Sequence, residues 1–108
     1  MVVMQFEVYY VALDPTMGSE IQKTRPCMVI SPDVMNRSLN TVFIIPLTST
    51  IRAYPTRVNC NFNKKNGQLA VDQLRAVDKV RLVKRLGAIS DKKVLAETLD
   101  LLQEIFSF

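Results

Sequence analysis

The residues of this 108-residue chain that could act on a substrate are a cation, a hydroxyl group and carboxylates, because the sequence contains no histidine. Arg25 precedes Pro26, Glu20 lies five positions upstream of Arg25, and Thr48 follows a later apolar run. A guanidinium and a hydroxyl group suit the stabilisation of charge on a phosphate when the substrate supplies its own nucleophile. RNA, which carries a 2′-hydroxyl group, is such a substrate.

The distribution of charge favours a polyanionic partner. The net charge is +4, and the segment from Arg52 to Arg85 holds nine basic residues against two acidic ones. Each phosphate that Lys or Arg neutralises releases counterions, which favours binding to nucleic acid. Charge alone leaves open the alternative that this segment is a solvated surface.

The composition disfavours a metal site and a membrane span. Cys27 and Cys60 lie 33 positions apart, with no histidine to complete a zinc site, so we expect two packed, free thiols. No apolar run approaches the roughly 18 residues that cross a bilayer, and the N-terminus lacks the pattern of a secretory signal. We therefore expect a single cytoplasmic domain over residues 1–108, without metal, cofactor or membrane partner.

Apolar patterning predicts several short strands and then one helix. The expected strands are 6–13, 27–31, 42–47, 56–62, 68–74, 80–83 and 85–89, with a loop over 14–24 and one helical turn within 32–40. Asn66-Gly67 is expected to form a hairpin turn, and Pro46 suggests that the strand 42–47 ends at a sheet edge or bulge. This pattern predicts a mainly β (α+β) fold, a strongly bent sheet or small barrel with the helix packed on it.

The C-terminal helix is expected to begin after Ser90 or Asp91, either of which can cap it. Helical spacing predicts one buried apolar stripe, and Leu101 falls outside that stripe as a candidate partner contact. The stripe consists of Val94, Leu95, Leu99, Leu102, Ile105 and Phe106.

Seven short blocks resemble, in this order and at compatible spacing, the MazF/PemK/Kid toxins, which are mRNA-cleaving endoribonucleases. The blocks are Asp14-Pro15-Thr16, Gly18-Ser19-Glu20, Arg25-Pro26, Ile30-Ser31-Pro32, Pro46-Leu47-Thr48-Ser49, Tyr54-Pro55 and Asp72-Gln73. The resemblance implies an SH3-like small barrel of six to seven strands with a C-terminal helix, and a homodimer. It further implies a cognate antitoxin protein and metal-independent, sequence-specific cleavage of single-stranded mRNA.

The same resemblance implies the site residues. The family's catalytic arginine and threonine fall on Arg25 and Thr48, its loop glutamate falls on Glu20, and its catalytic or RNA-contacting aspartate falls on Asp72. RNA contacts are expected at Thr24, Ser49, Tyr54, Gln73 and Arg75, with Tyr54 stacking on a base. One departure is that the glycine that usually opens the first strand is replaced around Phe6.

The resemblance assigns charge stabilisation to Arg25 and positioning of the phosphate to Thr48. The general base stays open between Glu20 and Asp72, since a surface carboxylate is normally too acidic to be an efficient base near neutrality.

Two other functions stay open at this point. One is a gyrase-binding toxin of the same fold, the CcdB type, which relies on a tryptophan near its C-terminus. This chain has no tryptophan and ends Ile105-Phe106-Ser107-Phe108. The other is a noncatalytic module that binds RNA through the basic segment.

Overall fold

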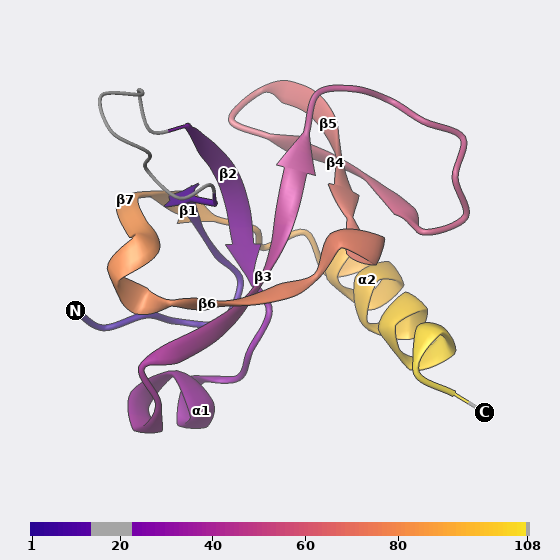
Figure 1. Ribbon diagram of the computed structural model, residues 1–108. Coiled ribbons are helices and arrows are strands. Elements are labelled where there is room, and N and C mark those ends of the chain that lie inside the picture. The colour runs from indigo at the N-terminus through magenta and orange to yellow at the C-terminus, as the bar shows by residue number, and fades with distance from the viewer. Residues whose placement is uncertain (14–22, 108) are drawn as a thin grey trace.

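The computed structural model describes residues 1–13 and 23–107, which form seven β-strands, two α-helices and two single-turn 3₁₀ helices (Figure 1). The strands are β1 (Glu7–Ala12), β2 (Thr24–Val29), β3 (Thr41–Thr48), β4 (Arg57–Phe62), β5 (Lys65–Ala70), β6 (Arg75–Asp78) and β7 (Leu82–Ala88). The helices are α1 (Asp33–Ser38), α2 (Lys92–Ile105), η1 (Val71–Gln73) and η2 (Lys79–Arg81).

One antiparallel sheet contains all seven strands, in the order β4-β5-β3-β2-β1-β7, with β6 paired to β3. At Ile44, one edge of β3 pairs with β2 and the other edge pairs with β6. From Leu47 on, that second edge of β3 pairs with β5 instead. This change of partner bends the sheet, and α2 packs beside the β4–β5 hairpin (Figure 1). The predicted mainly β, small-barrel-like fold with a C-terminal helix is confirmed, although the terminal strands β4 and β7 do not pair to close it.

Pro46 lies where β3 changes partner. The pairing with β6 ends at Ile44, and the pairing with β5 begins at Leu47. Proline has no N–H to donate, so it fits a point where one edge of the strand lacks a partner. The strand continues to Thr48, one residue beyond the predicted end at Leu47.

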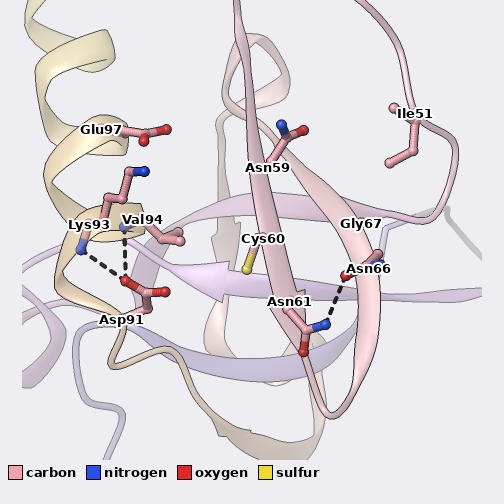
Figure 2. Close-up of a pocket in the computed structure, with 10 residues that line it drawn as sticks. All are labelled: Ile51, Asn59, Cys60, Asn61, Asn66, Gly67, Asp91, Lys93, Val94 and Glu97. Atoms are coloured by element: carbon pink, nitrogen blue, oxygen red, sulfur yellow. Dashed lines mark hydrogen bonds between the residues drawn. The ribbon is translucent and has the colours of Figure 1, made fainter.

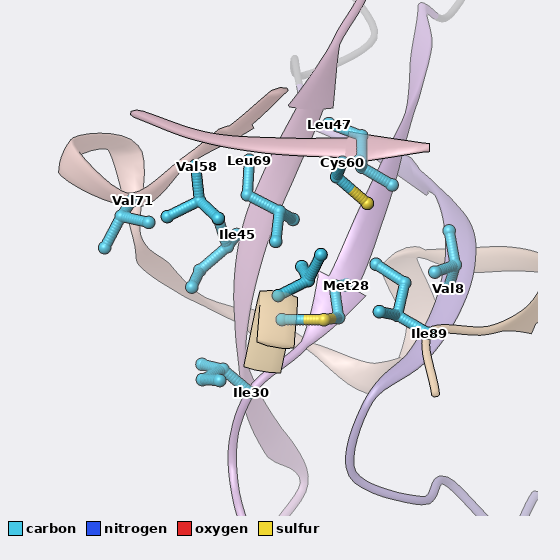
Figure 3. Close-up of a cluster of buried hydrophobic side chains, with 11 residues drawn as sticks. Val8, Met28, Ile30, Ile45, Leu47, Val58, Cys60, Leu69, Val71 and Ile89 are labelled. Carbon is cyan, nitrogen blue, oxygen red and sulfur yellow. The ribbon is translucent and has the colours of Figure 1, made fainter. Parts of the chain in front are cut away.

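Alternating side chains divide the buried residues between the two faces of the sheet. Met28 and Ile45 belong to the larger cluster, against which α2 packs, whereas Cys27 and Ile44 belong to a second cluster. Figure 3 shows the larger cluster, in which side chains from β1 to β5 converge. This division fixes which face every further residue of β2 and β3 presents, because side chains alternate along a strand.

The cap of α2 matches the sequence prediction, but the buried face of the helix does not. The carboxylate of Asp91 accepts hydrogen bonds from the backbone N–H groups of Lys93 and Val94, at 3.0 and 3.4 Å. Thr98 is fully buried, and its hydroxyl group donates to the carbonyl oxygen of Val94 at 2.8 Å. This internal bond satisfies the hydroxyl group, so a polar residue takes a core position.

The buried stripe is therefore rotated from the predicted one. Leu101, expected outside the stripe, packs partly against the core. Leu99, Ile105 and Phe106, expected inside it, are 43%, 41% and 68% exposed.

The β4–β5 hairpin forms, but its turn lies three residues before the predicted one. Asn63 and Lys64 have φ of 51° and 64°, and the flanking residues Phe62 and Lys65 pair, as in a two-residue hairpin turn. Gly67 instead lies within β5, where an added Cβ would approach the carbonyl oxygen of Thr48 to 2.6 Å. The glycine thus serves close packing of two backbones, not the turn.

Other strand boundaries also differ from the prediction. The expected strand 68–74 ends at Ala70 and continues as η1, while β2 begins at Thr24, earlier than expected. The strand β6 was not predicted, and the expected strand 80–83 is wrong because η2 occupies 79–81. Asp78 starts η2 by accepting the N–H of Val80 at 2.9 Å, and β7 then runs unbroken.

Phe6 lies where the resemblance implies a glycine, and its backbone conformation is one that favours glycine. Its φ is 73°, in the left-handed region that costs an L-residue roughly 1–2 kcal/mol. Two backbone hydrogen bonds hold this conformation, from the Phe6 N–H to the Val29 carbonyl at 2.7 Å and from the Ile89 N–H to the Phe6 carbonyl at 2.9 Å. The aromatic ring packs partly against the larger cluster, which offsets part of the strain.

We predict that Lys64→Gly stabilises the protein by about 1 kcal/mol, because an asparagine followed by a glycine suits a turn with positive φ at both positions. Urea denaturation measures the change. The neighbouring change Lys65→Gly, within β5, is the control and should destabilise by about 0.5–1 kcal/mol. Equal effects of both changes would contradict the assignment of the turn.

A buried carboxylate on β1 links stability to pH. Glu7 accepts hydrogen bonds from the Met4 N–H at 2.6 Å and the Tyr9 hydroxyl group at 3.2 Å, and it forms an ion pair with Arg85. Burial raises the pKa of Glu7, but the hydrogen bonds from Arg85, Met4 and Tyr9 outweigh it, so the pKa lies below its ordinary value. The stability that this lowered pKa provides is present above the unfolded-state pKa and is lost as pH falls through the folded-state pKa.

Glu7→Gln should therefore lower Tm at pH 7, and the deficit should shrink as pH falls below roughly 4. Protonation removes the same charge from the unmodified protein, which is why the two proteins converge. Thermal unfolding between pH 7 and 3 measures this, with the exposed Glu104→Gln as control. A deficit that stays constant with pH would rule out the ionised Glu7 as its source.

Candidate functional site

Arg25 and Thr48 lie on adjacent antiparallel strands. The pairing of β2 with β3 ends at Cys27 and Pro46, and Arg25 and Thr48 each lie two residues beyond that last pair, at the same end of the two strands. Both side chains project from the face that carries the second cluster, because they alternate in step with Cys27 and Ile44. A guanidinium and a hydroxyl group 23 positions apart in the sequence thus belong to the same face of neighbouring strands.

A second guanidinium belongs to the same face. Arg75 pairs with Ile44 at the start of β6, and its side chain is exposed, as is that of Arg25. Burial raises the pKa of the Cys27 thiol to about 12, while the charges of Arg25 and Arg75 both act to lower it. Both arginines are therefore near this thiol, and their combined charge suits a phosphate.

The hydroxyl group of Thr48 has a fixed orientation. Its oxygen accepts a hydrogen bond from the backbone N–H of Thr50 at 3.1 Å, where β3 turns into the 49–56 loop. Because that bond uses a lone pair of the oxygen, the O–H remains free to donate to a ligand. Ser49, next to it, is exposed.

A small apolar cleft of about 120 Å³ adjoins Thr48 and Ser49. Its lining includes Pro26 and Leu47, which alternate with Arg25 and Thr48 and so face the opposite side of the strands. The cleft continues toward the β4–β5 hairpin through Cys60, Phe62, Lys65, Asn66 and Gly67.

Gln68 anchors the 49–56 loop to the sheet, a role that the sequence analysis missed. Its side-chain oxygen accepts the backbone N–H of Arg52 at 3.0 Å, and its side-chain nitrogen donates to the carbonyl oxygen of Arg52 at 3.1 Å. Gln68 also pairs with Thr48 across the β3–β5 ladder and is only 4% exposed. The sequence did offer a signal, because Gln68 is a polar residue directly before Leu69 and Ala70 in an apolar run. A glutamine that is buried there must form hydrogen bonds, which predicts a structural role for its amide.

Asp72 belongs to a different group of side chains from Arg25 and Thr48. One carboxylate oxygen accepts hydrogen bonds from the Thr56 hydroxyl group at 3.1 Å and from the Nε of Arg57 at 3.2 Å. The guanidinium of Arg57 lies 5.2 Å from the centroid of the Tyr54 ring, within range of a cation–π interaction. Arg57, which the sequence analysis did not single out, therefore links Asp72 to Tyr54.

The remaining predicted residues are dispersed around these groups. Thr24, exposed, begins β2 and pairs with Ala12; Gln73, also exposed, ends η1. Glu20 lies outside the described residues. Cys27 and Cys60 are both free and buried.

The described residues offer neither a cluster of metal ligands nor a helix that could span a membrane. Among residues 1–13 and 23–107, no group of three or more Cys, Asp or Glu side chains is placed to hold a metal ion. Neither α-helix in that part of the chain has the length and apolar character of a membrane span.

Comparisons with known proteins agree on one family. A family model described as a PemK-like, MazF-like toxin of a type II toxin-antitoxin system matches residues 4–106. Endoribonuclease MazF of Staphylococcus saprophyticus is 34% identical over 94 residues, covering 82% of this chain and 78% of that protein. Endoribonuclease EndoA of Bacillus subtilis is 30% identical over 98 residues, covering 85% and 84%.

Among solved structures, a MazE–MazF crystal structure from Deinococcus radiodurans (Form-II) superposes with a TM-score of 0.82 at 25% identity, covering 97% of this chain and 96% of that one. The MazF structure from the same organism (Form-I) covers 100% of this chain with a TM-score of 0.81 at 24% identity. The family model spans nearly the whole chain, and the sequence relatives cover more than four fifths of it. The chain therefore belongs to the family of PemK-like, MazF-like toxins of type II toxin–antitoxin systems.

Proposed function

We propose that this protein is an endoribonuclease toxin that cleaves single-stranded mRNA at the Arg25–Thr48 pair. The observation that supports the proposal is the β2–β3 register, which puts Arg25 and Thr48 on one face of the sheet, each two residues beyond the last pair, Cys27 and Pro46; the Thr48 oxygen also accepts a hydrogen bond from the Thr50 N–H. Sequence relatives that carry the name endoribonuclease add independent support.

The proposed reaction is an internal transfer on the RNA. The ribose 2′-oxygen forms a bond to the adjacent phosphorus, and the bond from phosphorus to the 5′-oxygen of the next nucleotide breaks. The 2′-hydroxyl group gives up one proton and the leaving oxygen gains one, so the products end in a 2′,3′-cyclic phosphate and a 5′-hydroxyl group. Neither water nor a metal ion enters this balance.

Arg25 would stabilise the negative charge that develops on the phosphoryl oxygens, and Thr48 would donate its hydroxyl group to the same phosphate. Preorganised donors of this kind are usually the largest catalytic contribution, each worth roughly 100- to 1,000-fold in rate. The exposed guanidinium of Arg75 on the same face would hold the RNA backbone, with Thr24 and Ser49 at the ends of the two strands as further contacts.

The general base stays a proposal with two candidates. Asp72 is already engaged by Thr56 and Arg57, and these contacts favour a positioning role over proton transfer. Glu20 is the other candidate that the resemblance implies, and we assign it the base on that ground.

A stacking platform is the proposed role of Tyr54. Its ring is 53% exposed, and Arg57, itself tied to Asp72, lies over the ring. A base of single-stranded RNA could stack on the exposed part of the ring, a contact worth roughly 1–3 kcal/mol in other proteins. Gln73, which follows Asp72 in η1, would contact the RNA beside it.

Membership of the family also supports proposals about the partners of this protein. We expect a homodimer and a cytoplasmic location, and we expect inhibition by a cognate antitoxin. The Deinococcus radiodurans structure is itself a MazE–MazF complex, which supports an antitoxin partner for this chain.

We predict that Arg25→Ala lowers the cleavage rate by at least about 100-fold while leaving Tm within a few degrees, because the exposed side chain acts through charge and not through packing. Cleavage of a labelled single-stranded RNA on a denaturing gel measures the rate. The control Arg37→Ala removes an exposed arginine from α1, beyond the far end of β2, and should cleave normally.

The same assay separates the other functions. RNA that is bound but not cut by the unmodified protein would indicate a noncatalytic module, and inhibition of gyrase without cleavage would indicate the CcdB type. A folded Arg25→Ala protein that cleaves at the normal rate would refute the proposed site.

A second prediction concerns Gly67. Gly67→Ala forces a Cβ toward the carbonyl oxygen of Thr48, which must move away from its 2.6 Å approach. We expect a stability loss of about 1–3 kcal/mol and at least about a tenfold fall in kcat, since the end of β3 orients the Thr48 hydroxyl group. Single-turnover cleavage and urea denaturation measure the two effects, with the exposed Ala88→Ser as control. Normal kcat in the destabilised protein would show that this contact does not position Thr48.

A further inference from the structure

The 49–56 loop connects two groups of proposed site residues, although little of it is packed. Thr48 directly precedes the loop, and Tyr54 lies near its end. Residues 51–53 are exposed and form no regular secondary structure. Ile51 borders a pocket of about 490 Å³ beside the β4–β5 hairpin and the start of α2, so the loop adjoins open space at this point (Figure 2). Because few buried contacts leave a segment with low local stability, burial does not fix the course of this loop.

Hydrogen bonds to a single side chain hold the middle of the loop. The amide oxygen of Gln68 accepts the backbone N–H of Arg52 at 3.0 Å, and the amide nitrogen donates to the carbonyl oxygen of Arg52 at 3.1 Å. In the described part of the chain, no other hydrogen bond joins residues 51–53 to the sheet. We call these two bonds the Gln68 clamp.

The surroundings of Gln68 favour one orientation of its amide. The amide nitrogen also donates to the Oδ1 of Asn59 at 3.0 Å, so both of its hydrogens and the amide oxygen have partners. A reversed amide would set its NH₂ group against the N–H of Arg52. Gln68 is only 4% exposed, and a buried amide without partners costs free energy. The network therefore fixes this side chain and, through it, the main chain of Arg52.

The clamp belongs to the strand that also pairs with Thr48. Gln68 stands opposite Thr48 in the β3–β5 ladder, so its side chain sets the position of residue 52 relative to the proposed catalytic hydroxyl group. The carbonyl oxygen of Tyr54, two residues further on, accepts the N–H of Arg57 at 3.2 Å. The loop is thus held at residue 52 and again at residue 54, which fixes the separation of Thr48 from the Tyr54 ring.

We propose that Gln68 is a positioning residue of the nuclease, which pre-organises the 49–56 loop so that one strand of RNA reaches Thr48 and Tyr54 together. The inference rests on the proposed function. In this role Gln68 touches neither the RNA nor the reacting atoms and acts through the main chain of Arg52. Without the clamp the loop samples further conformations, and RNA binds only the competent fraction of the protein. Because bound RNA orders the loop again, the loss falls on binding and not on the chemical step.

The first test is the steady-state cleavage of a labelled single-stranded RNA by Gln68→Val, which removes the clamp and keeps a strand-forming side chain. We expect KM to rise roughly tenfold while kcat stays within about threefold of the unmodified value. A merely structural role would do the reverse, since loss of folded protein lowers kcat and leaves KM unchanged. The control Asn61→Ala removes an exposed amide of β4 that is bonded to Asn66 and should change neither constant (Figure 2).

Gln68→Glu adds a readout that depends on pH. The ionised side chain can accept the N–H of Arg52 but repels its carbonyl oxygen, whereas the protonated side chain can accept from the one and donate to the other. Burial favours the protonated form. We expect the KM of this variant, divided by that of the unmodified protein at the same pH, to fall toward one between about pH 8 and about pH 5. The ratio for Gln68→Val should not change with pH.

Limited proteolysis tests the clamp without catalysis. Trypsin cleaves after arginine, and Arg52 is exposed, but cleavage requires the main chain around it to leave the sheet. Gln68→Val should therefore speed cleavage of the bond between residues 52 and 53 by at least roughly tenfold, and Asn61→Ala should not. Circular dichroism and Tm show whether each variant is folded.

The outcomes separate the two proposals. If the unmodified protein cleaves no RNA, the proposed function fails and Gln68 has no reaction to assist. If it cleaves RNA, and folded Gln68→Val keeps the normal KM or loses only kcat, the positioning role is refuted while the nuclease stands. Trypsin cleavage after Arg52 at equal rates in Gln68→Val and the unmodified protein would refute the clamp itself.

Discussion

The pairing of β2 with β3 is the interaction on which the rest of the site depends. It sets the face on which Arg25 and Thr48 project, and it runs through the middle of the sheet, where both faces are covered by buried side chains. Cys27 and Ile44 hold one face, and Met28 and Ile45 hold the other. A shift of one residue in this register would turn each of these side chains to the wrong face, so the core itself enforces the geometry of the site.

The small size of the chain explains why structural and functional residues share the same few strands. With 108 residues, the sheet has little surface that is remote from its core. Gly67 packs against Thr48 and also lines the small cleft, while Gln68 pairs with Thr48 and also holds the 49–56 loop. Neighbouring residues of one strand thus connect the proposed site, the loop and the cleft.

Local signals in the sequence were sufficient for most elements and insufficient for their contacts. The cap at Asp91 and the mainly β pattern depend on nearby residues, and both predictions are confirmed. The turn at Asn63 and Lys64 was misplaced because Asn66-Gly67 has the stronger turn propensity, and only packing against Thr48 shows why a glycine is needed in β5. The helix stripe was misplaced because a hydroxyl-bearing residue looks polar in the sequence, whereas Thr98 is buried with its hydroxyl group satisfied by the carbonyl of Val94.

Some residues of the candidate site could be identified from the sequence, whereas the role of others needed the structure. Arg25 and Thr48 were identified through a resemblance, and that they share one face of neighbouring strands needed the strand register. Arg57 and Gln68 escaped notice because their importance comes from partners distant in sequence, such as Asp72 for Arg57 and Arg52 for Gln68. Composition gives no information about such pairings.

The clamp of Gln68 on Arg52 has a consequence for how this protein could diversify. Gln68 holds the main chain of residue 52 through its N–H and carbonyl groups and makes no demand on the side chain there. A substitution at residue 52 that keeps its N–H group would therefore leave this attachment of the loop to the sheet intact. The side chain at position 52 is thus free to vary without rebuilding the scaffold.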